Sequence, residues 1–281
     1  MRIIALFNQK GGVGKTTTTA NLGAALAAAG KRTVLIDLDP QANLTTHFGI
    51  NPETVSLSTY RVLTDGIPLV EALVDVTGVG EGESKASLRI APATTDLAAA
   101  EIELVSVVGR ESLLKKMAGL AAGGAKAGGV EADFVLIDCP PSLGLLSLNA
   151  LTYATEVIVP LQAHFLALQG MEKLFETISM VRKGLNPALH ISGILFCQFE
   201  SAARLTGEVT GEVEGFVKQA RGTHHPVARA VIFQTSVRRN IKLAEAPSFG
   251  QSIFRYAPSS AGAADYSVLA EEVLKMGSAA D

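Results

Sequence analysis

The chain of 281 residues is 48% hydrophobic and carries a formal net charge of −3, which suits one large globular domain or two small ones. No stretch approaches the roughly 18 consecutive apolar residues of a membrane span, and the start "MRIIALFNQK" lacks the length and the cleavage site of a secretory signal. These features argue against an integral membrane protein or a secreted protein and predict a cytoplasmic location.

The two cysteines, Cys139 and Cys197, lie far apart, without the paired spacings of disulfide frameworks or zinc sites. This usage fits a reducing compartment and predicts no iron–sulfur cluster. Charge is uneven: residues 182–255 contain ten Lys or Arg and five Asp or Glu, a net +5, which leaves −8 for the remainder. The +5 segment is either an ordinary solvated surface or a site for an anionic partner.

In chain order, short apolar runs alternate with helical patterns. "RIIALFN", "RTVLIDLDP" and "DFVLIDCPP" are rich in β-branched residues, which is typical of buried parallel strands. "EVIVPLQ" and "ISGILFCQF" repeat the pattern, and "PVARAVIFQ" offers a further strand. Helical patterns cover residues 16–29, 95–121, 143–154, 168–185, 206–219 and 263–276.

This alternation predicts the fold class. Strands that alternate with helices form a mostly parallel sheet with helices on both faces, the doubly wound α/β arrangement. Two Gly-rich stretches, residues 77–87 and 121–132, are predicted to be surface loops rather than linkers. We therefore expect a single domain over residues 1–281.

The stretch "NQKGGVGKTTTTANL" joins the first strand to the first helix. The common phosphate-binding loop reads G-x-x-x-x-G-K-[ST], and Gln9 stands where its first glycine is expected. Glycines still let the backbone approach an anion, and the start of the following helix adds partial positive charge. The stretch therefore predicts a phosphate site. Its predicted members are Gly11, Gly12, Val13, Gly14, Lys15, Thr16 and Thr17.

Three of these side chains have predicted roles at a bound nucleotide. We expect Lys15 to bind the β- and γ-phosphates, the Thr16 hydroxyl to bind Mg²⁺, and Thr17 to contact phosphate. Asp138 ends the run "FVLIDCPP", in the place of a Walker B aspartate that holds Mg²⁺ directly or through water. The predicted chemistry is ATP hydrolysis with Mg²⁺.

Two further carboxylates lie in "VLIDLDPQ". Asp37 and Asp39 alternate along the strand, so both point to one face near its C-terminal end. Ligands of open α/β sheets bind outside those ends. We predict that Asp39 lies near the metal and orients the attacking water, and that Asp37 is a structural group. The alternative is that both aspartates only cap a turn.

A second lysine, Lys10, begins the loop. The transition state of hydrolysis spreads negative charge over the γ-phosphate oxygens, where an extra cation raises the rate. Because Lys10 starts the loop, its side chain is poorly placed to reach the γ-phosphate of its own chain. The residues alone leave two hypotheses: Lys10 reaches the nucleotide of a second subunit, or it is a solvated surface lysine.

The pattern K-G-G-x-G-K-[ST] beginning at Lys10 resembles the deviant Walker A motif of the ParA/MinD ATPases. "VLIDLDPQANLT", "VLIDCPPSLGLLSLNAL", "VIVPLQAHFLALQGM" and "RRNIKLAEAPSFGQSI" resemble blocks of the ParA (Soj-type) partition proteins, so the resemblance covers nearly the whole chain. It implies an ATPase of weak intrinsic activity with ATP and Mg²⁺ as cofactors. It also implies an ATP-dependent sandwich homodimer in which Lys10 contacts the nucleotide of the other subunit.

The resemblance further divides the single domain. Residues 1–160 would form the nucleotide-binding core, and residues 161–281 would supply the adenine-side and DNA-binding elements. The segment around Pro247 resembles the adenine-side loop of the family.

ParA dimers bind DNA without sequence preference. Arg204 and Arg239 match arginines that carry this activity, and both lie in the +5 segment. Arg238 and Lys242 are further candidates, although the family usually has a proline where Arg238 stands. Such contacts would go to phosphates and would weaken as salt rises.

The implied function is the segregation or positioning of DNA on the nucleoid, with a ParB-like partner that stimulates hydrolysis. A chromosome, a plasmid or a protein assembly such as a microcompartment are open alternatives for the cargo. A MinD-like membrane ATPase would need a basic amphipathic C-terminal helix, whereas "SVLAEEVLKMGSAAD" has three acids and one lysine. An adaptor that uses ATP only as a dimerisation switch is the remaining alternative.

Overall fold

The computed structural model describes residues 1–76, 87–120, 129–163, 167–199 and 204–278. Its centre is a nine-stranded sheet with the order β3-β4-β2-β5-β1-β6-β7-β8, and β9 also pairs with β7. All paired strands are parallel except β3, which is antiparallel to β4. The strands are β1 (Arg2–Leu6), β2 (Thr33–Asp37), β3 (Val74–Asp75), β4 (Leu88–Ala91), β5 (Phe134–Asp138), β6 (Glu156–Gln162), β7 (His190–Phe199), β8 (Val231–Ile232) and β9 (Val237–Arg238).

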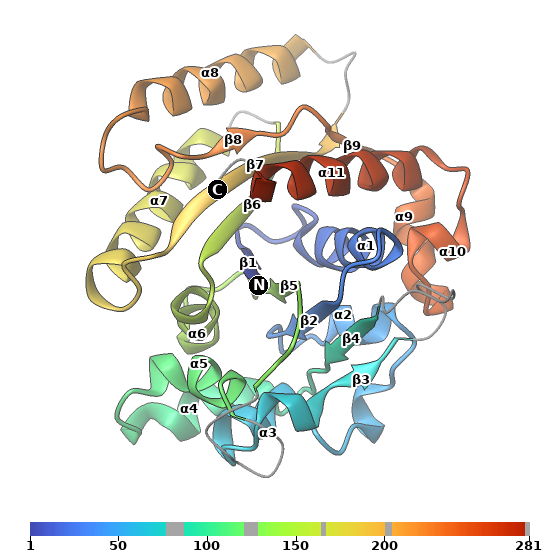
Figure 1. Ribbon diagram of the computed structural model, residues 1–281. Coiled ribbons are helices and arrows are strands. Elements are labelled where there is room, and N and C mark those ends of the chain that lie inside the picture. Colours follow the sequence, from blue (N-terminus) through green and yellow to red (C-terminus); the bar gives the residue numbers. More distant parts are fainter. Residues whose placement is uncertain (77–86, 121–128, 164–166, 200–203, 279–281) are drawn as a thin grey trace.

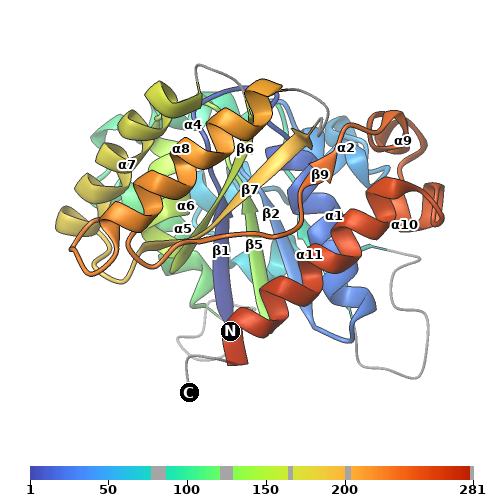
Figure 2. The same cartoon turned by 90° about the horizontal axis from the view of Figure 1, so that it is seen from above.

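Helices cover both faces of this sheet, as Figures 1 and 2 show. The helices are α1 (Lys15–Ala28), α2 (Asn43–His47), α3 (Thr59–Thr64), α4 (Leu97–Glu103), α5 (Leu113–Ala118), α6 (Leu145–Tyr153), α7 (Ala167–Gly184), α8 (Arg204–Ala220), α9 (Ile241–Glu245), α10 (Ile253–Tyr256) and α11 (Ala261–Ser278). Short 3₁₀ helices lie at Pro52–Thr54, Leu69–Ala72, Leu104–Ser106, Arg110–Ser112 and Ala246–Phe249, the last labelled η6.

The central strands have a separate hydrophobic core on each side. Along β1 and just beyond it, Ile3 and Phe7 pack into a core with α3 to α8, whereas Ile4 and Leu6 pack into a core with α1, α2 and α9 to α11. This alternation places successive side chains on opposite faces of the sheet. Strands buried on both faces read as continuous apolar runs, which is why the sequence predicts them. The predicted doubly wound, mostly parallel α/β domain is confirmed.

Helix α1 packs closely on the sheet because of one glycine. A Cβ atom on Gly23 would lie 2.6 Å from Cδ2 of Leu35 in β2. Glycine at this position therefore lets α1 approach β2. In the described residues, none of the helices combines the length and the apolar character that crossing a bilayer requires.

The structure corrects several predicted elements. The pattern over residues 95–121 forms α4, two 3₁₀ turns and α5 instead of one helix, because Val107 is extended and Gly109 adopts a left-handed φ of 73°. Strands β4 and β9 were not predicted, since each is too short for a clear pattern. "PVARAVIFQ" supplies only the two residues of β8. Most of the predicted loops at 77–87 and 121–132 lies outside the described residues.

Candidate nucleotide-binding site

The predicted site lies where β1, β5 and β2 end. These strands are adjacent in the sheet, and Asp138 of β5 is in register with Leu6 of β1 and with Asp37 of β2. The loop of residues 8–14 follows β1 and leads into α1. All three strands thus bring their C-terminal ends to the start of α1, which is the ligand-binding edge of an open α/β sheet.

The loop has the geometry of an anion cradle. Gly12 and Gly14 have φ angles of 74° and 92°, which side chains rarely adopt, and Cβ atoms on Gly11 and Gly12 would meet no atom within 4 Å. Asn8 anchors the base of the loop, because its Nδ2 donates to the Pro160 carbonyl at 2.8 Å and its Oδ1 accepts from the Lys10 amide at 3.0 Å.

Lys15 is a buried cation at the first position of α1. It is 6% exposed, and its Nζ donates to the carbonyl of Lys10 at 3.3 Å. Burial lowers the pKa of Lys15, while the negative charges of Asp138 and Asp39 oppose this shift. A buried ammonium group with one neutral acceptor is suited to an anionic ligand such as phosphate.

Asp138 is a buried carboxylate whose charge acts on Lys15. It is completely buried, and neither carboxylate oxygen has a hydrogen-bond partner. Burial, and then the charge of Asp37, raise the pKa of Asp138 well above its ordinary value, while the Thr16 and Lys15 side chains oppose the rise. Two buried acceptor atoms without partners beside the Thr16 hydroxyl fit a hydrated Mg²⁺, which binds proteins through one or two oxygen groups together with phosphate.

Asp37 and Asp39 have different surroundings. Asp37 is buried and accepts three hydrogen bonds, from the Asp39 amide at 3.1 Å and from the amide and hydroxyl of Thr45 at 2.9 and 2.7 Å. Burial still raises its pKa to about 6. Asp39 accepts from the Gln41 amide at 3.0 Å and is 8% exposed. Asp37 therefore holds the start of α2, and Asp39 is the carboxylate nearer to solvent.

Lys10 lies on the outer side of the loop. Its Nζ is 3.5 Å from Oε1 of Gln162, at the end of β6. Gln162 and Gln198, which the sequence did not single out, both donate from Nε2 to the carbonyl of Gly12, at 3.2 and 3.0 Å. The only sequence signal for them is that Gln162 ends the apolar strand β6 and Gln198 is the next-to-last residue of the apolar strand β7.

A cavity of about 370 Å³ opens beside the loop, between Gly14 and Thr17 on one side and β9 and α9 on the other. Pro247 is not among its lining residues and lies in η6, which packs against α2. Just beyond these two helices the backbones approach closely: a Cβ atom on Gly250 would lie 2.8 Å from the Cα atom of Gly49.

The four predicted DNA-binding residues lie on three elements. Arg204 begins α8, and its side chain is outside the described residues. Arg238 and Arg239 line the 370 Å³ cavity. Arg238 also pairs with Asp265 of α11, at 2.6 Å between Nη2 and Oδ1.

Lys242 is paired as well. Its Nζ lies 2.8 Å from Oε2 of Glu245. Arg238 and Lys242 therefore each have an acidic neighbour within the chain.

The loop, the strand-end aspartates and the parallel sheet define a nucleoside triphosphatase of the P-loop class. Residues 1–191 match the family model described as an AAA domain. The chain is 42% identical over 275 residues to "Chromosome partitioning protein ParA" of Myxococcus xanthus, covering 98% of this chain and 88% of the relative. It is 40% identical over 276 residues to "Sporulation initiation inhibitor protein Soj" of Bacillus subtilis, covering 98% and 99%. The chain belongs to the ParA/Soj family of chromosome partitioning proteins, as the resemblance predicted.

Solved structures agree with this class. "Cobyrinic Acid a,c-diamide synthase" from Mycobacterium smegmatis, with bound ADP and magnesium, has a TM-score of 0.77 and 34% identity, covering 100% of this chain and 96% of that one. The cell division ATPase MinD of Pyrococcus furiosus, at 22% identity and a TM-score of 0.74, covering 98% and 99%, shares the fold. ATP and Mg²⁺ are the cofactors of this ATPase family, and the glycine cradle with the two free oxygens of Asp138 fits them.

Proposed function

We propose that this protein is a ParA-type ATPase that dimerises when it binds ATP, binds DNA without sequence preference and is released when a ParB-like partner stimulates hydrolysis. The observation that carries the proposal is the pair of lysines around one glycine loop. Lys15 is buried at the loop, whereas the ammonium group of Lys10 is on its outer side, beside Gln162. A cation in that position is suited to a nucleotide held by a second subunit.

Each residue of the predicted site has a proposed role at the bound nucleotide. The amides of residues 11–17 and the ammonium group of Lys15 would bind the phosphates. The Thr16 hydroxyl and Asp138 would hold Mg²⁺, which neutralises charge on the phosphates when it is bound, and Asp39 would lie close to it. Asp39 would orient the attacking water, since its carboxylate is near the surface and Asp37 fixes the backbone amide of Asp39.

The proposed DNA contacts are Arg204 and Arg239, with Arg238 and Lys242 as weaker candidates. Contacts between these cations and DNA phosphates would release counterions, so affinity would fall steeply with salt. A dimer doubles the number of such contacts, and this would make DNA affinity, and the association with the nucleoid, depend on ATP.

Two alternatives to partition remain. An ATPase that positions a protein assembly would use the same nucleotide site; McdA of Cyanothece, at 19% identity, shares only the fold. The amidating enzyme named for the Mycobacterium smegmatis structure is 34% identical, below the 39–42% of the partition proteins. We favour partition because the basic residues of the +5 segment would have no role in amidation.

The test uses two variants and measures both dimer and DNA. With ATP and Mg²⁺, the Asp39→Ala protein should form a dimer that persists and stays on DNA, because the predicted water-orienting group is lost. Lys10→Ala should bind ATP and sediment as a monomer. Sedimentation velocity follows the dimer, and retention on immobilised DNA at rising salt follows the complex. If wild type and Asp39→Ala both stay monomeric with saturating ATP, the proposed cycle is wrong.

A charge reversal tests the DNA surface separately. Arg239→Glu should lose DNA binding while it keeps the ATP-dependent dimer. Arg61→Glu is the matched control, since Arg61 is exposed on α3 outside the +5 segment. Retention of Arg239→Glu on DNA at the salt concentration that retains wild type would remove Arg239 from the surface.

A further inference from the structure

Gln198 has an unusual backbone conformation. It has a φ of 52°, and among the described residues only Ala42 shares a positive φ without being glycine. The left-handed region costs an L-residue with a side chain about 1–2 kcal/mol. Such a conformation persists only where the surrounding contacts determine it.

The contacts that hold Gln198 come from the phosphate loop. Its Nε2 donates to the Gly12 carbonyl at 3.0 Å, and its Oε1 accepts from Nε2 of Gln162 at 2.6 Å. Gln162 donates to the same carbonyl at 3.2 Å, and its Oε1 lies 3.5 Å from Nζ of Lys10. Two glutamine amides therefore converge on one carbonyl of the loop and connect it to the ends of β6 and β7.

Gln198 is also the extra residue of a bulge between β7 and β9. Cys197 pairs with Val237 and Phe199 pairs with Arg238, so two steps along β7 match one step along β9. A bulge leaves one residue unpaired and re-aims its neighbours. Beyond the bulge, the amide of Arg239 donates to the Phe199 carbonyl at 3.5 Å. The positions of Arg238 in β9 and of Arg239 directly after it therefore depend on the conformation of Gln198.

We propose that Gln198 is a positioning residue that couples the phosphate loop to β9 and to Arg238 and Arg239 at its end. With its side chain on the Gly12 carbonyl, Gln198 is left-handed and β9 keeps the bulged register. Without that bond the residue can relax to an extended conformation, and a shift of one residue would turn the side chains of β9 to the opposite face. A ligand at the phosphate loop that moves the Gly12 carbonyl would therefore change the balance between the bulged and the shifted register of β9. Such a shared equilibrium is the condition for coupling between the loop and β9.

This inference rests on the proposed function only for the role of the two arginines in DNA binding. Its first test therefore needs no DNA. Amide hydrogen exchange of residues 237–239 is measured without ligand and at saturating ADP with Mg²⁺, with saturation checked by titration for each protein. The variants are Gln198→Gly, which tolerates the left-handed region without an amide, and Gln198→Asn, whose amide is one methylene too short. Gln234→Ala is the control, an exposed glutamine of the preceding loop.

In wild type and in the control, ADP should change exchange at residues 237–239 by about fivefold or more, the lower range of measured couplings between sites. In both Gln198 variants the change should fall below about twofold. The proposal is overturned if the variants respond as wild type does, or if saturating ADP leaves exchange of wild type unchanged.

A second measurement uses DNA. If wild type binds DNA more tightly with ATP, the Gln198 variants should bind with an affinity that no longer depends on ATP, and a preserved dependence would overturn the coupling. If wild type does not bind DNA at all, the proposed function fails, whereas the exchange experiment still decides the role of Gln198.

Discussion

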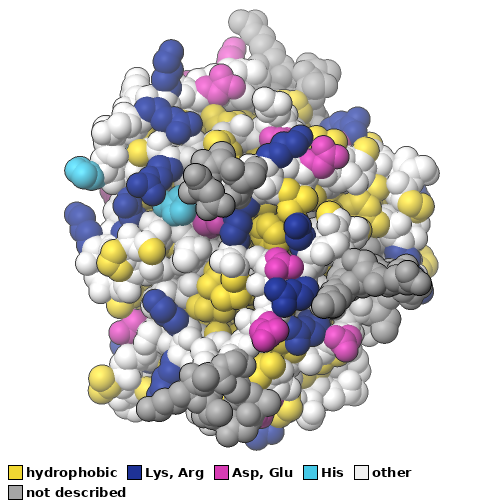
Figure 3. Space-filling model, in the orientation of Figure 1, with side chains coloured by type: hydrophobic (Ala, Val, Ile, Leu, Met, Phe, Trp, Pro, Cys, Tyr) yellow, Lys and Arg dark blue, Asp and Glu magenta, His cyan; other side chains and the backbone are white. Residues whose placement is uncertain are grey.

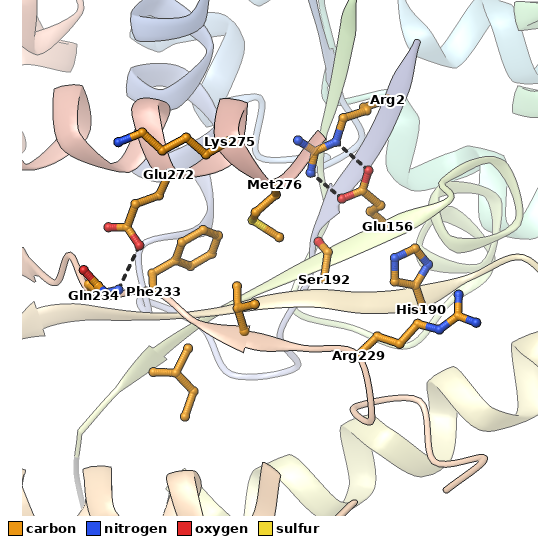
Figure 4. A pocket seen from close by; sticks show the side chains of 12 residues that line it. Arg2, Glu156, His190, Ser192, Arg229, Phe233, Gln234, Glu272, Lys275 and Met276 are labelled. Atoms are coloured by element: carbon orange, nitrogen blue, oxygen red, sulfur yellow. Dashed lines mark hydrogen bonds and ion pairs between the residues drawn. The ribbon is translucent and has the colours of Figure 1, made fainter. Parts of the chain in front are cut away.

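The two ends of the sheet bury charged groups in opposite ways. At the N-terminal ends of the strands, a cavity of about 880 Å³ contains the ion pair of Arg2 and Glu156, at 2.6 Å between Nη2 and Oε2 (Figure 4). Arg2 also donates to the Val273 carbonyl. The face of the molecule at this end shows Lys and Arg interspersed with Asp and Glu (Figure 3).

At the C-terminal ends, the buried Lys15 has one neutral acceptor and Asp138 has none. Paired charges contribute to the stability of the fold, whereas charges left without partners lower stability and are available to a ligand. The unsatisfied groups therefore mark the C-terminal ends of the strands as the ligand-binding end of the sheet.

The largest expected effect is on nucleotide binding at the C-terminal ends of the strands. Lys15→Ala should weaken ADP·Mg²⁺ binding on the order of 100-fold or more, because it removes a charge-assisted contact to phosphate. Isothermal titration calorimetry measures the loss. Lys275→Ala is the matched control at the other end, where the side chain is 76% exposed, and its affinity should equal that of wild type. Equal affinities for all three proteins would remove Lys15 from the site.

At the N-terminal ends of the strands, where the charges are paired, the expected effect is on the stability of the fold. Glu156→Gln leaves the Arg2 guanidinium without its anion and should lower the free energy of unfolding by about 3 kcal/mol, with ADP affinity unchanged. Burial alone would raise the pKa of Glu156, but the hydrogen bonds and charge of Arg2 outweigh it and lower the pKa below the ordinary 4.5.

The pH dependence of that variant follows from the sign of this shift. Because the folded pKa is below the unfolded value, the stabilisation by the pair is present above pH 4.5 and is lost as pH falls through the folded pKa. Urea unfolding between pH 3 and 7 should therefore show wild type and Glu156→Gln converging in acid. A constant difference over this range would contradict the role of the ion pair.

The smallest expected effect is on Asp138, which is compared with Asp37, its partner in register on the neighbouring strand. Asp138→Asn replaces an acid that burial drives toward its neutral form by a neutral amide of the same shape, so the free energy of unfolding without nucleotide should change by less than about 1 kcal/mol, while Mg²⁺-dependent ADP binding falls. Asp37→Asn is the control, because it disrupts the hydrogen bonds from Thr45 and Asp39 and should destabilise the fold. If both variants destabilise equally, the contrast between satisfied and unsatisfied carboxylates does not hold.

The sequence predicts those features that neighbouring residues determine. Gly14, Lys15 and Thr16 form a local motif after an apolar run, and Asp138 ends another run, so both could be assigned to one edge of a parallel sheet. The sequence does not predict the break at Val107 and Gly109, because the apolar spacing continues across it, although an extended and then a left-handed backbone interrupt the helix there. The network of Gln162 and Gln198 depends on β7 pairing with β9, about 40 residues further along, and on the loop after β1, which no local pattern contains.

The bare backbone contact between Gly49 and Gly250 ties the segment after Asp39 to the turn that carries Pro247. A methyl group at Gly250 would lie 2.8 Å from the Cα atom of Gly49 and would push the two segments apart, whereas one at Gly49 would come no closer than 3.5 Å to Gly250. Because the two backbones touch directly, a displacement of one segment should be passed to the other.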